Sequence, residues 1–298
     1  MADVSVVIRC KNEAGQIGET LDAVLSQKGP FHPEVLVVDS GSTDGTLEIS
    51  RKFPVTIMSM PPAEFSYGRA LNFGISSCRS DRICLLSAHC VPRDSGWLAT
   101  LLDPILSEKA DAVYGRQIPV RGVNPWEEFY LHLLFPEGGE YADRVPFSNA
   151  QCVFRRIMWE EQRFDEKIAR WEDYLWYRLL RDRYRFVYCS RAVVLHSHPF
   201  RWRSYARMCY RDGMAARWFL THYGINLAGE RTASPLGFFA AFLKASLIRA
   251  AFFAKAGYFS ELLSGPFIQL AGYAAYAAGY LSQGRRFFGP GEVGCQRP

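Results

Sequence analysis

The sequence from residue 37 to residue 46 reads Val-Val-Asp-Ser-Gly-Ser-Thr-Asp-Gly-Thr. The run at 34–38, apolar after Glu34, predicts a buried β-strand, and the polar, glycine-containing residues after it predict a tight turn. Thr43 is suited to cap the next helix, with Asp44 in its first turn. A turn and a helix cap explain most of this stretch, but Asp39, at the end of the strand, is also placed to accept hydrogen bonds from a base or a ribose.

The alternation of strand and helix patterns extends through the first 115 residues. Strands are expected at 4–8, 34–38, 55–58 and 83–86, and helices at 15–27, 70–77 and 97–107. This order predicts an α/β fold with a mostly parallel central sheet and helices on both faces. Ligands bind at the carboxyl ends of the strands in such sheets. The polar residues expected at those ends are Asn12, Glu13, Asp39, Ser87 and His89.

The composition fits one large or two small folded domains. The chain has 298 residues, 49% hydrophobic and 14% aromatic, which excludes a disordered chain. Residues 1–220 carry 28 Lys or Arg and 27 Asp or Glu, whereas residues 221–298 carry 7 and 3. A nearly neutral body argues against a dedicated nucleic-acid-binding protein, which would present a basic face. The excess positive charge lies in an apolar C-terminal part, which raises the question of a membrane surface.

The cysteine pattern and the N-terminus favour a reduced, cytoplasmic protein. The eight cysteines include no C-x-x-C pair, and most lie in apolar runs, so neither a disulfide framework nor a thiolate zinc site is expected. The chain enters a strand pattern at Val4 without a preceding basic segment or long apolar core, so no signal peptide is expected.

Six further segments accompany the Asp39 turn in a characteristic order. They read VSVVIRCKNEA at 4–14, FSYGRALNFGI at 65–75, LLSAHCVP at 85–92, FSNAQCVFRR at 147–156, WED at 171–173 and VVLHSH at 193–198. Over about residues 3–215 this series resembles the family 2 glycosyltransferases, which have a GT-A-type fold. The segments at 65–75 and 193–198 most resemble bacterial rhamnosyltransferase-type members. The resemblance implies inverting transfer of a sugar from a nucleotide-diphosphate sugar to a glycan or lipid-linked acceptor.

The resemblance also assigns roles to individual residues. Glu13 and Asp39 match positions that contact the nucleoside, and Arg69 and Asn72 match a segment lining the nucleotide pocket, although Arg69 also fits a surface position on a helix. Asp173 matches the catalytic base, which removes the proton of the acceptor hydroxyl as that oxygen attacks the anomeric carbon. An acidic residue at the start of a helix also interacts favourably with the helix dipole, and the two interpretations are compatible.

The chain departs from the family pattern at Ser87-Ala88-His89, where members usually carry an Asp-x-Asp motif that holds a divalent metal on the diphosphate. A metal, Mn²⁺ or Mg²⁺, bound by His89 and His198, with His196 as the alternative to His198, is one interpretation; imidazole suits Mn²⁺ and later ions better than Mg²⁺. A second is that His89 donates a hydrogen bond directly to the diphosphate. A third is a non-catalytic regulator or scaffold that only binds nucleotide sugar.

The acceptor side is expected near two other segments. Arg155 and Arg156 follow a segment that shapes this side in the family, but they also fit a solvated pair. Trp171, beside Glu172 and the predicted base, is suited to stack on a sugar face, or else to pack in the core.

The C-terminal part is expected to be a separate helical extension. We predict a glycosyltransferase domain at 1–222 and an apolar, basic extension at 223–298, in which residues 262–284 carry no formal charge. Its glycines and alanines argue against a membrane span. Two interpretations stay open: amphipathic helices on the anionic inner leaflet near a lipid-linked acceptor, or helices packed on the catalytic body or on a second subunit of a homo-oligomer.

Overall fold

The computed structural model describes residues 3–138, 145–226 and 235–282, and of residues 235–242 it describes the backbone only. Its strands are β1 (Val4–Cys10), β2 (Pro33–Asp39), β3 (Thr56–Ser59), β4 (Arg82–Ser87), β5 (Cys90–Pro92), β6 (Ala112–Ile118), β7 (Gln151–Arg155) and β8 (Phe186–His196). Its helices are α1 (Ile17–Leu25), α2 (Thr46–Ser50), the 3₁₀ helix η1 (Pro62–Glu64), α3 (Tyr67–Ser76), α4 (Trp97–Leu106), α5 (Pro125–Leu134), α6 (Arg156–Glu161), α7 (Glu172–Leu180), α8 (Trp202–Tyr223), α9 (Pro235–Ala256) and α10 (Phe259–Leu281).

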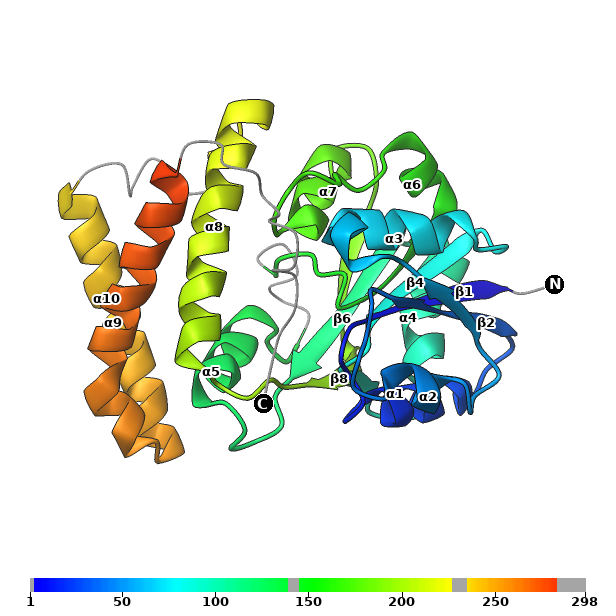
Figure 1. The fold of residues 1–298 in the computed structure, drawn as a ribbon, viewed down its shortest axis with the longest axis horizontal. Helices are drawn as coiled ribbons and strands as arrows, with labels where there is room; N and C mark the ends of the chain where they lie inside the picture. The colour runs from blue at the N-terminus through cyan, green and yellow to red at the C-terminus, as the bar shows by residue number, and fades with distance from the viewer. Residues whose placement is uncertain (1–2, 139–144, 227–234, 283–298) are drawn as a thin grey trace.

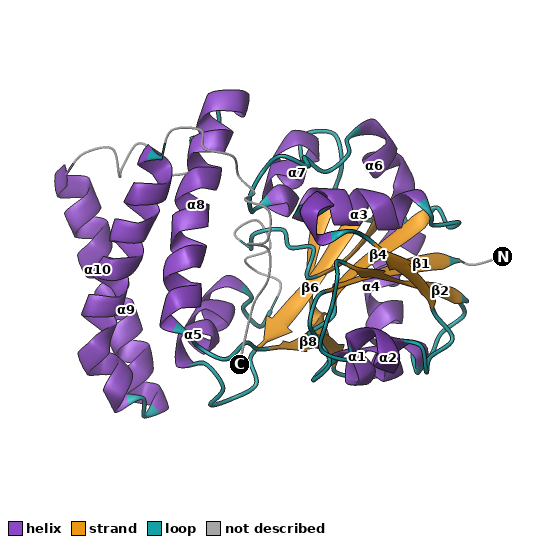
Figure 2. Cartoon of the chain, in the orientation of Figure 1, coloured by secondary structure: helices purple, strands orange, loops and turns teal. Residues whose placement is uncertain are grey.

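The described strands form one mixed sheet in the order β3-β2-β1-β4-β7-β6-β8-β5, with helices on both faces (Figures 1 and 2). This confirms the expected α/β fold. The pairs β1–β2, β1–β4, β2–β3 and β6–β8 are parallel, whereas β7 lies antiparallel between β4 and β6. The carboxyl ends of β1, β2 and β4 therefore meet at one edge of the sheet, where a ligand site is expected.

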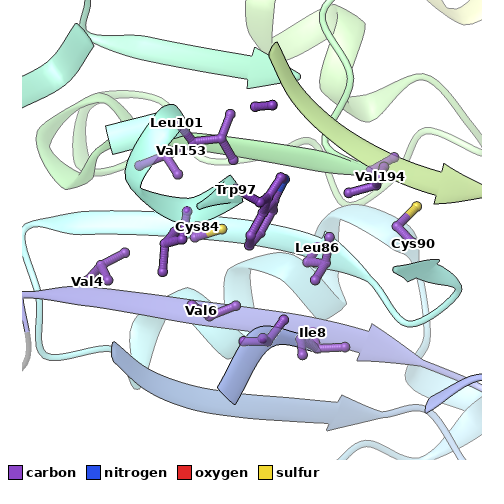
Figure 3. Close-up of a cluster of buried hydrophobic side chains, with 14 of the residues drawn as sticks. Val4, Val6, Ile8, Cys84, Leu86, Cys90, Trp97, Leu101, Val153 and Val194 are labelled. Atoms are coloured by element: carbon purple, nitrogen blue, oxygen red, sulfur yellow. The ribbon is translucent and has the colours of Figure 1, made fainter. Parts of the chain in front are cut away.

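Alternating side chains of the strands supply two hydrophobic cores, one on each face of the sheet. On one face Val6 and Ile8 of β1 and Leu86 of β4 pack with Trp97 and Leu101 of α4 (Figure 3). The opposite face, which includes Val7 and Leu85, packs against α3, α6 and α7. Because Arg9 follows Ile8, its side chain belongs to the second face, toward α3 and α7.

The C-terminal helices pack on one another and on the rest of the chain through α8 and α5, as one of the two interpretations of the extension requires. Figure 1 shows α8, α9 and α10 side by side, with α8 nearest the sheet. Glycines allow α8 and α10 to approach closely, because a Cβ at Gly213 would lie 2.0 Å from the carbonyl oxygen of Tyr276, and one at Gly279 would lie 1.9 Å from that of Tyr210. The predicted boundary at residue 222 thus falls at the end of a helix that packs mainly on the extension.

The positive charges of the extension do not all face solvent. Arg249 is 5% exposed, and its guanidinium lies over the rings of Trp126 (4.8 Å) and Phe129 (5.5 Å) in α5. It also donates a hydrogen bond to Gln269 of α10. Arg249 therefore joins α9 to α5 and α10 and is unavailable to a membrane surface, whereas Arg285 and Arg286 lie outside the described residues.

Two further expectations concern cysteines and membrane spans. The cysteines among the described residues are all free thiols, and six of the seven are buried. None of the described helices combines the length and the hydropathy that crossing a bilayer requires.

Candidate functional site

Three histidines meet where β5 pairs with the end of β8. His89 lies in the turn between β4 and β5, and the antiparallel pairing of Cys90 with His196 brings this turn beside the last residue of β8. The ring centroid of His89 lies 5.0 Å from that of His196 and 4.3 Å from that of His198. One potential ligand atom from each residue lies within 4.8 Å of the other two. The structure therefore brings together all three histidines considered from the sequence.

Each of these rings is held by an oxygen on its Nδ1 side. His89 Nδ1 lies 2.9 Å from Glu13 Oε1, His196 Nδ1 lies 2.6 Å from Gln117 Oε1, and His198 Nδ1 lies 2.7 Å from Glu127 Oε1. These anchoring residues come from the β1–α1 loop, from β6 and from the first turn of α5. Histidines that bind metals commonly donate their other N–H in this way.

Burial separates the protonation states of the three rings. Burial lowers the pKa of His89 and of His196 well below the ordinary value, which keeps both rings neutral. Burial acts in the same direction on His198, but the hydrogen bond and the negative charge of Glu127 outweigh it and raise the pKa of His198. Burial raises the pKa of Glu13 to about 7 despite the nearby charge of His198.

The donor set fits some divalent metals better than others. The affinity of three imidazole nitrogens for first-row divalent ions rises from Mn²⁺ to the later ions, whereas Mg²⁺ prefers oxygen ligands. Ser87, at the position where the family usually has the first carboxylate, offers no negative charge to the site. The residues therefore fit a transition-metal ion and do not fit Mg²⁺.

Asp173 lies in the first turn of α7, whose N-cap residue Trp171 has a left-handed backbone conformation with φ 65°. The Asp173 carboxylate accepts hydrogen bonds from the backbone N–H of Asn149 (3.1 Å) and of Tyr174 (2.7 Å). Burial, followed by the negative charge of Glu172, raises the pKa of Asp173 to about 7, although both backbone hydrogen bonds act in the opposite direction. A carboxylate with this pKa can exchange protons near neutral pH.

Arg9 is a functional candidate that the sequence reasoning missed. Its Nη1 lies 3.9 Å from Glu172 Oε1, and its guanidinium lies 4.4 Å from the centre of the Tyr67 ring. Its positive charge lowers the pKa of Glu13, Asp173 and His89 alike. Arg9 therefore lies among the residues expected to handle the donor and the acceptor. The available signal was a basic residue near the carboxyl end of the first strand.

Two loops that hydrogen-bond to each other position Glu13. Asn12, with φ 57°, accepts a hydrogen bond from the backbone of Thr43, and the hydroxyl of Ser42 accepts one from the backbone of Asn12. The hydroxyl of Thr46 accepts another from the backbone of Glu13. The β1–α1 and β2–α2 loops are thus fixed to each other, which places the Glu13 side chain against His89.

Asp39 lies in the same pair of loops and is 1% exposed. Its carboxylate accepts hydrogen bonds from the backbone N–H groups of Gly41 (2.9 Å) and Ser42 (3.1 Å) and from the Ser42 hydroxyl. In this conformation Asp39 stabilises the turn, as the interpretation from turn chemistry requires, and its predicted contact with a nucleoside stays a prediction.

The nucleotide-pocket residues expected on α3 are engaged elsewhere. The Asn72 amide donates to Phe164 O and to Glu166 Oε1 and accepts from Trp159 Nε1 and from the Phe164 backbone N–H. Both donors and both acceptor positions of Asn72 are therefore used within the chain, which gives Asn72 a structural role, and its predicted place in the nucleotide pocket stays a prediction. Arg69 forms an exposed ion pair with Glu64 (2.6 Å), which agrees with the surface interpretation of this residue.

The expected acceptor residues Arg155 and Arg156 lie away from this site. Because β7 is antiparallel to β4, Arg155 pairs with Arg82 at the amino end of β4, while Ser87 is at the other end. Arg82 and Ser87 are five residue steps apart along the strand, about 17 Å. Arg155 forms an ion pair with Asp111 there (3.4 Å), and the predicted role of the two arginines on the acceptor side stays a prediction.

The other two residues expected on the acceptor side do lie beside Asp173. Glu172 is 5% exposed and accepts a hydrogen bond from the Asn149 side chain (3.0 Å). Trp171 packs against the cluster that includes Phe219, with the two rings edge to face. This contact is the core packing considered for Trp171, and stacking on a sugar stays a prediction.

Comparison with known proteins identifies relatives of the chain. Residues 5–168 match the family described as Glycosyl transferase family 2. The chain is 25% identical over 215 residues to the O-antigen chain rhamnosyltransferase RfbN of Salmonella typhimurium. This match covers 66% of the chain and 67% of RfbN. The chain is 34% identical over 155 residues to the glycosyltransferase AglE of Haloferax volcanii, and this match covers 50% of the chain and 46% of AglE. The matched segments thus span between about half and two thirds of these relatives.

Solved structures show the same fold at low sequence identity. The mannosyltransferase PcManGT of Pyrobaculum calidifontis, solved with GDP-Man and Mn²⁺, superimposes with a TM-score of 0.62 over 95% of this chain and 90% of its own, at 18% identity. The glucosyl-3-phosphoglycerate synthase of Mycobacterium tuberculosis, solved with Mn²⁺ and UDP, superimposes with a TM-score of 0.57. The match covers 76% of this chain and 82% of the synthase, at 19% identity. The family match covers more than half of the chain, and the protein therefore belongs to glycosyl transferase family 2.

Proposed function

We propose that this protein transfers a sugar from a nucleoside-diphosphate sugar to a hydroxyl group of a glycan or lipid-linked acceptor, with inversion at the anomeric carbon. The observation that carries the proposal is Asp173, a carboxylate at a helix N-terminus whose pKa burial raises to about 7. The relatives named as rhamnosyltransferases of O-antigen chains and the neighbours solved with GDP-Man or UDP support this class of donor and acceptor.

In the proposed reaction, one Asp173 oxygen accepts the proton of the acceptor hydroxyl. The acceptor oxygen then forms a bond to the anomeric carbon from the side opposite the nucleotide, and the bond from that carbon to the diphosphate oxygen breaks. The hydrogen bonds from Asn149 and Tyr174 fix the orientation of the Asp173 carboxylate. Proton removal by a positioned base typically contributes about 10²–10⁴ to the rate.

The leaving diphosphate carries negative charge, and the site offers two kinds of compensation. Arg9 supplies a permanent positive charge near Glu172 and Asp173. The three histidines would hold a divalent ion, which would stabilise the charge that develops on the diphosphate. If His89 donates a hydrogen bond to the diphosphate instead, Arg9 carries most of the charge compensation.

We also propose that the outer face of α10 contacts the inner leaflet of a membrane that carries the acceptor. This face exposes large apolar side chains at a helical spacing: Phe259, Leu263, Phe267, Leu270 and Leu281. Lys244 and Lys255 are exposed on the neighbouring α9 and match anionic lipid headgroups. The same face also suits a second copy of the chain, and membrane flotation separates the two.

The test is transfer from a panel of UDP, GDP and dTDP sugars to lipid-linked or oligosaccharide acceptors. Donor binding is first detected as thermal stabilisation by the nucleotide sugar. Nuclear magnetic resonance of the product then reports whether the anomeric configuration is inverted. Release of nucleoside diphosphate that depends on both the acceptor and Asp173 supports the proposal. Donor binding without turnover on any acceptor would favour a nucleotide-sugar-binding regulator instead.

A further inference from the structure

We propose that Arg170 binds a phosphate group of the substrates at the transfer site, and that Asp212, on α8, positions it. The phosphate belongs either to the diphosphate of the donor or to the acceptor, and the experiment separates the two sources. The inference rests on the proposed function, because it adds a residue to the same site. It also gives the helices that follow residue 200 a role in substrate binding.

Arg170 lies directly before the helix that carries the predicted base. Trp171, the N-cap residue of α7, has a left-handed backbone with φ 65°, a conformation that residues other than glycine seldom adopt. Residues held in such conformations are concentrated at functional sites. The turn at Trp171 separates the segment that carries Arg170 from the first turn of α7, which carries Glu172 and Asp173.

Asp212 holds the guanidinium group of Arg170 at one of its three nitrogens. Asp212 Oδ1 lies 2.8 Å from Arg170 Nε, and the two side chains are 17% and 32% exposed. Apart from this ion pair, no N–H group of Arg170 has a hydrogen-bond partner within the described part of the chain. The two Nη groups are therefore available, and together they form the planar fork that binds a phosphate through two parallel hydrogen bonds.

The charge of Arg170 acts on groups that the proposed reaction uses. Burial acts to lower the pKa of Arg170, but the negative charge of Asp212 raises it. The carboxylates of Glu172 and Asp173 act in the same direction as Asp212. At His198, the charge of Arg170 acts together with burial to lower the pKa, against the effect of the neighbouring carboxylates. Arg170 is therefore within electrostatic reach of both the predicted base and the histidine cluster.

The nearby carboxylates do not supply acceptors for the two Nη groups. Burial raises the pKa of Asp212 to about 6 despite the charge of Arg170, so Asp212 is ionised at neutral pH, but it contacts Nε alone. Glu172 lies 3.9 Å from Arg9 and accepts a hydrogen bond from the Asn149 side chain. Water can accept the remaining hydrogen bonds in the free protein. A phosphate replaces water with charged oxygens, whose hydrogen bonds to a guanidinium are about twice as strong as those between neutral groups.

The position of Asp212 is set by contacts on both sides of α8, which lies between α7 and α10 (Figure 1). Toward α7, the rings of Trp171 and Phe219 pack edge to face within one hydrophobic cluster. Toward α10, a Cβ at Gly213 would lie 2.0 Å from the carbonyl oxygen of Tyr276, so the two helices touch beside Asp212. The orientation of Arg170 therefore depends on how the C-terminal helices pack.

The experiment uses the full-length protein and measures the two sources of phosphate separately. Calorimetry with UDP, GDP and dTDP tests the donor, and the KM values of a neutral oligosaccharide and of a phosphate-bearing lipid-linked saccharide test the acceptor. Arg170→Gln should either weaken diphosphate binding or raise the KM of the phosphate-bearing acceptor alone, by at least about 10-fold. The first result assigns Arg170 to the donor and the second assigns it to the acceptor. Arg183→Gln is the matched control and should change neither, because Arg183 pairs with Glu161 (3.0 Å) beyond the C-terminal end of α7.

Asp212→Asn tests the positioning role. It should change the same quantity as Arg170→Gln, to a smaller extent, and Asp212→Glu should recover part of the loss. In an Arg170→Gln background Asp212→Asn should have no further effect, because Asp212 acts through Arg170. Circular dichroism and thermal melting show whether each variant is folded. Arg170→Lys, which keeps the charge but lacks the fork, provides a second test if Arg170→Gln does not fold.

The outcomes are distinguishable. Unchanged diphosphate affinity together with unchanged KM values in folded Arg170→Gln would overturn the inference, and so would an equal rise in KM for the neutral and the phosphate-bearing acceptor. Additive effects of Asp212→Asn and Arg170→Gln would overturn the positioning role. Sugar transfer that is the same in the wild type and in Arg170→Gln would remove this inference and leave the proposed function intact. Diphosphate binding that depends on Arg170, in a protein that transfers no sugar, would remove the proposed function and keep the binding role.

Discussion

Replacing Asp173 with Asn should abolish transfer and should also remove a loss of stability that the wild type undergoes as pH rises toward 7. The backbone N–H groups of Asn149 and Tyr174 donate to different oxygens of Asp173, so the single oxygen of the asparagine can accept only one of these two hydrogen bonds. The variant also has no group that can take a proton. We expect kcat to fall by about 10²–10⁴, with nucleotide affinity unchanged. The effect of the variant on stability should become more favourable as pH rises. The reason is that the wild-type site holds a negative charge in a partly buried position beside Glu172.

The direction and size of the stability change follow from the raised pKa. Asp173 has a folded-state pKa of about 7 against 3.8 for the free group, so the folded protein holds this proton more tightly than the unfolded chain. The free energy of unfolding therefore falls as pH rises from about 4 to 7 and stays constant above that window. Three pKa units correspond to at most about 4 kcal/mol. Partial solvent exposure and the coupling to Glu172 reduce the expected pH-dependent part of the change to about 2 kcal/mol.

The assay is urea unfolding of wild type and Asp173→Asn at pH 4.5 and pH 8, with Asp22→Asn, an exposed carboxylate on α1, as the control. The stability difference between Asp173→Asn and wild type should grow by about 2 kcal/mol between these pH values, and that of Asp22→Asn should not. The pH profile of kcat/KM for the wild type should lose activity below about pH 7. Turnover near the wild-type level in the variant would refute the assignment of the base, and a pH-independent stability difference would refute the raised pKa.

Three further predictions address other parts of the molecule. Arg9→Gln removes a positive charge that lowers the pKa of Asp173, so the acidic limb of the kcat/KM profile should move to higher pH; an unmoved limb would contradict this role. Gly279→Ala should destabilise the protein by about 1–3 kcal/mol in thermal or urea melts, because its Cβ would lie 1.9 Å from a carbonyl of α8, whereas Gly265→Ala on the same helix, with its nearest contact at 4.0 Å, should not. Phe267→Glu should reduce flotation with anionic liposomes and leave the oligomeric state unchanged. If flotation is unchanged and a dimer is lost instead, the outer face of α10 binds a second copy of the chain.

The first half of the fold was predictable because its signals are local. The β-branched run at 4–8 and the apolar run at 83–86 form β1 and β4, and the glycine and aspartate turn after β2 forms as expected. The direction of β7 was not predictable, because it depends on pairing with β4 and β6 far away in the sequence. The sequence therefore could not show that Arg155 lies at the amino end of β4, far from Ser87.

The histidines were predictable as candidates, but their anchoring residues were not. His89 stood out as a polar residue after a strand, and the Leu-His-Ser-His ending stood out through the resemblance to the family. Gln117 and Glu127 have no such signal, since a glutamine within a strand and a glutamate in the first turn of a helix are both ordinary. Their role arises from tertiary pairing, which brings β6 beside β8 and α5 beside the segment that follows β8.

The lack of a carboxylate at position 87 affects the charge around Arg9. Arg9 and Ser87 are in register on the parallel pair β1–β4, with side chains on the same face of the sheet. An aspartate at position 87 would lie beside the Arg9 guanidinium and pair with it. With serine there, the nearest carboxylate is that of Glu172, 3.9 Å away, and the guanidinium keeps positive charge for the diphosphate.

Ser87→Asp should therefore weaken the binding of nucleoside diphosphate, because the new carboxylate pairs with Arg9 and repels the phosphates. A hydrogen bond to a charged group contributes about 1.5–3 kcal/mol, so we expect a loss of at least about 10-fold in calorimetric affinity. Ser87→Ala, which removes the hydroxyl without adding charge, should change the affinity little. In an Arg9→Gln background the effect of Ser87→Asp should shrink, since one of its two causes is gone. Wild-type affinity in Ser87→Asp, or full additivity with Arg9→Gln, would show that Arg9 does not meet the diphosphate, and the charge compensation would then rest on the histidine cluster.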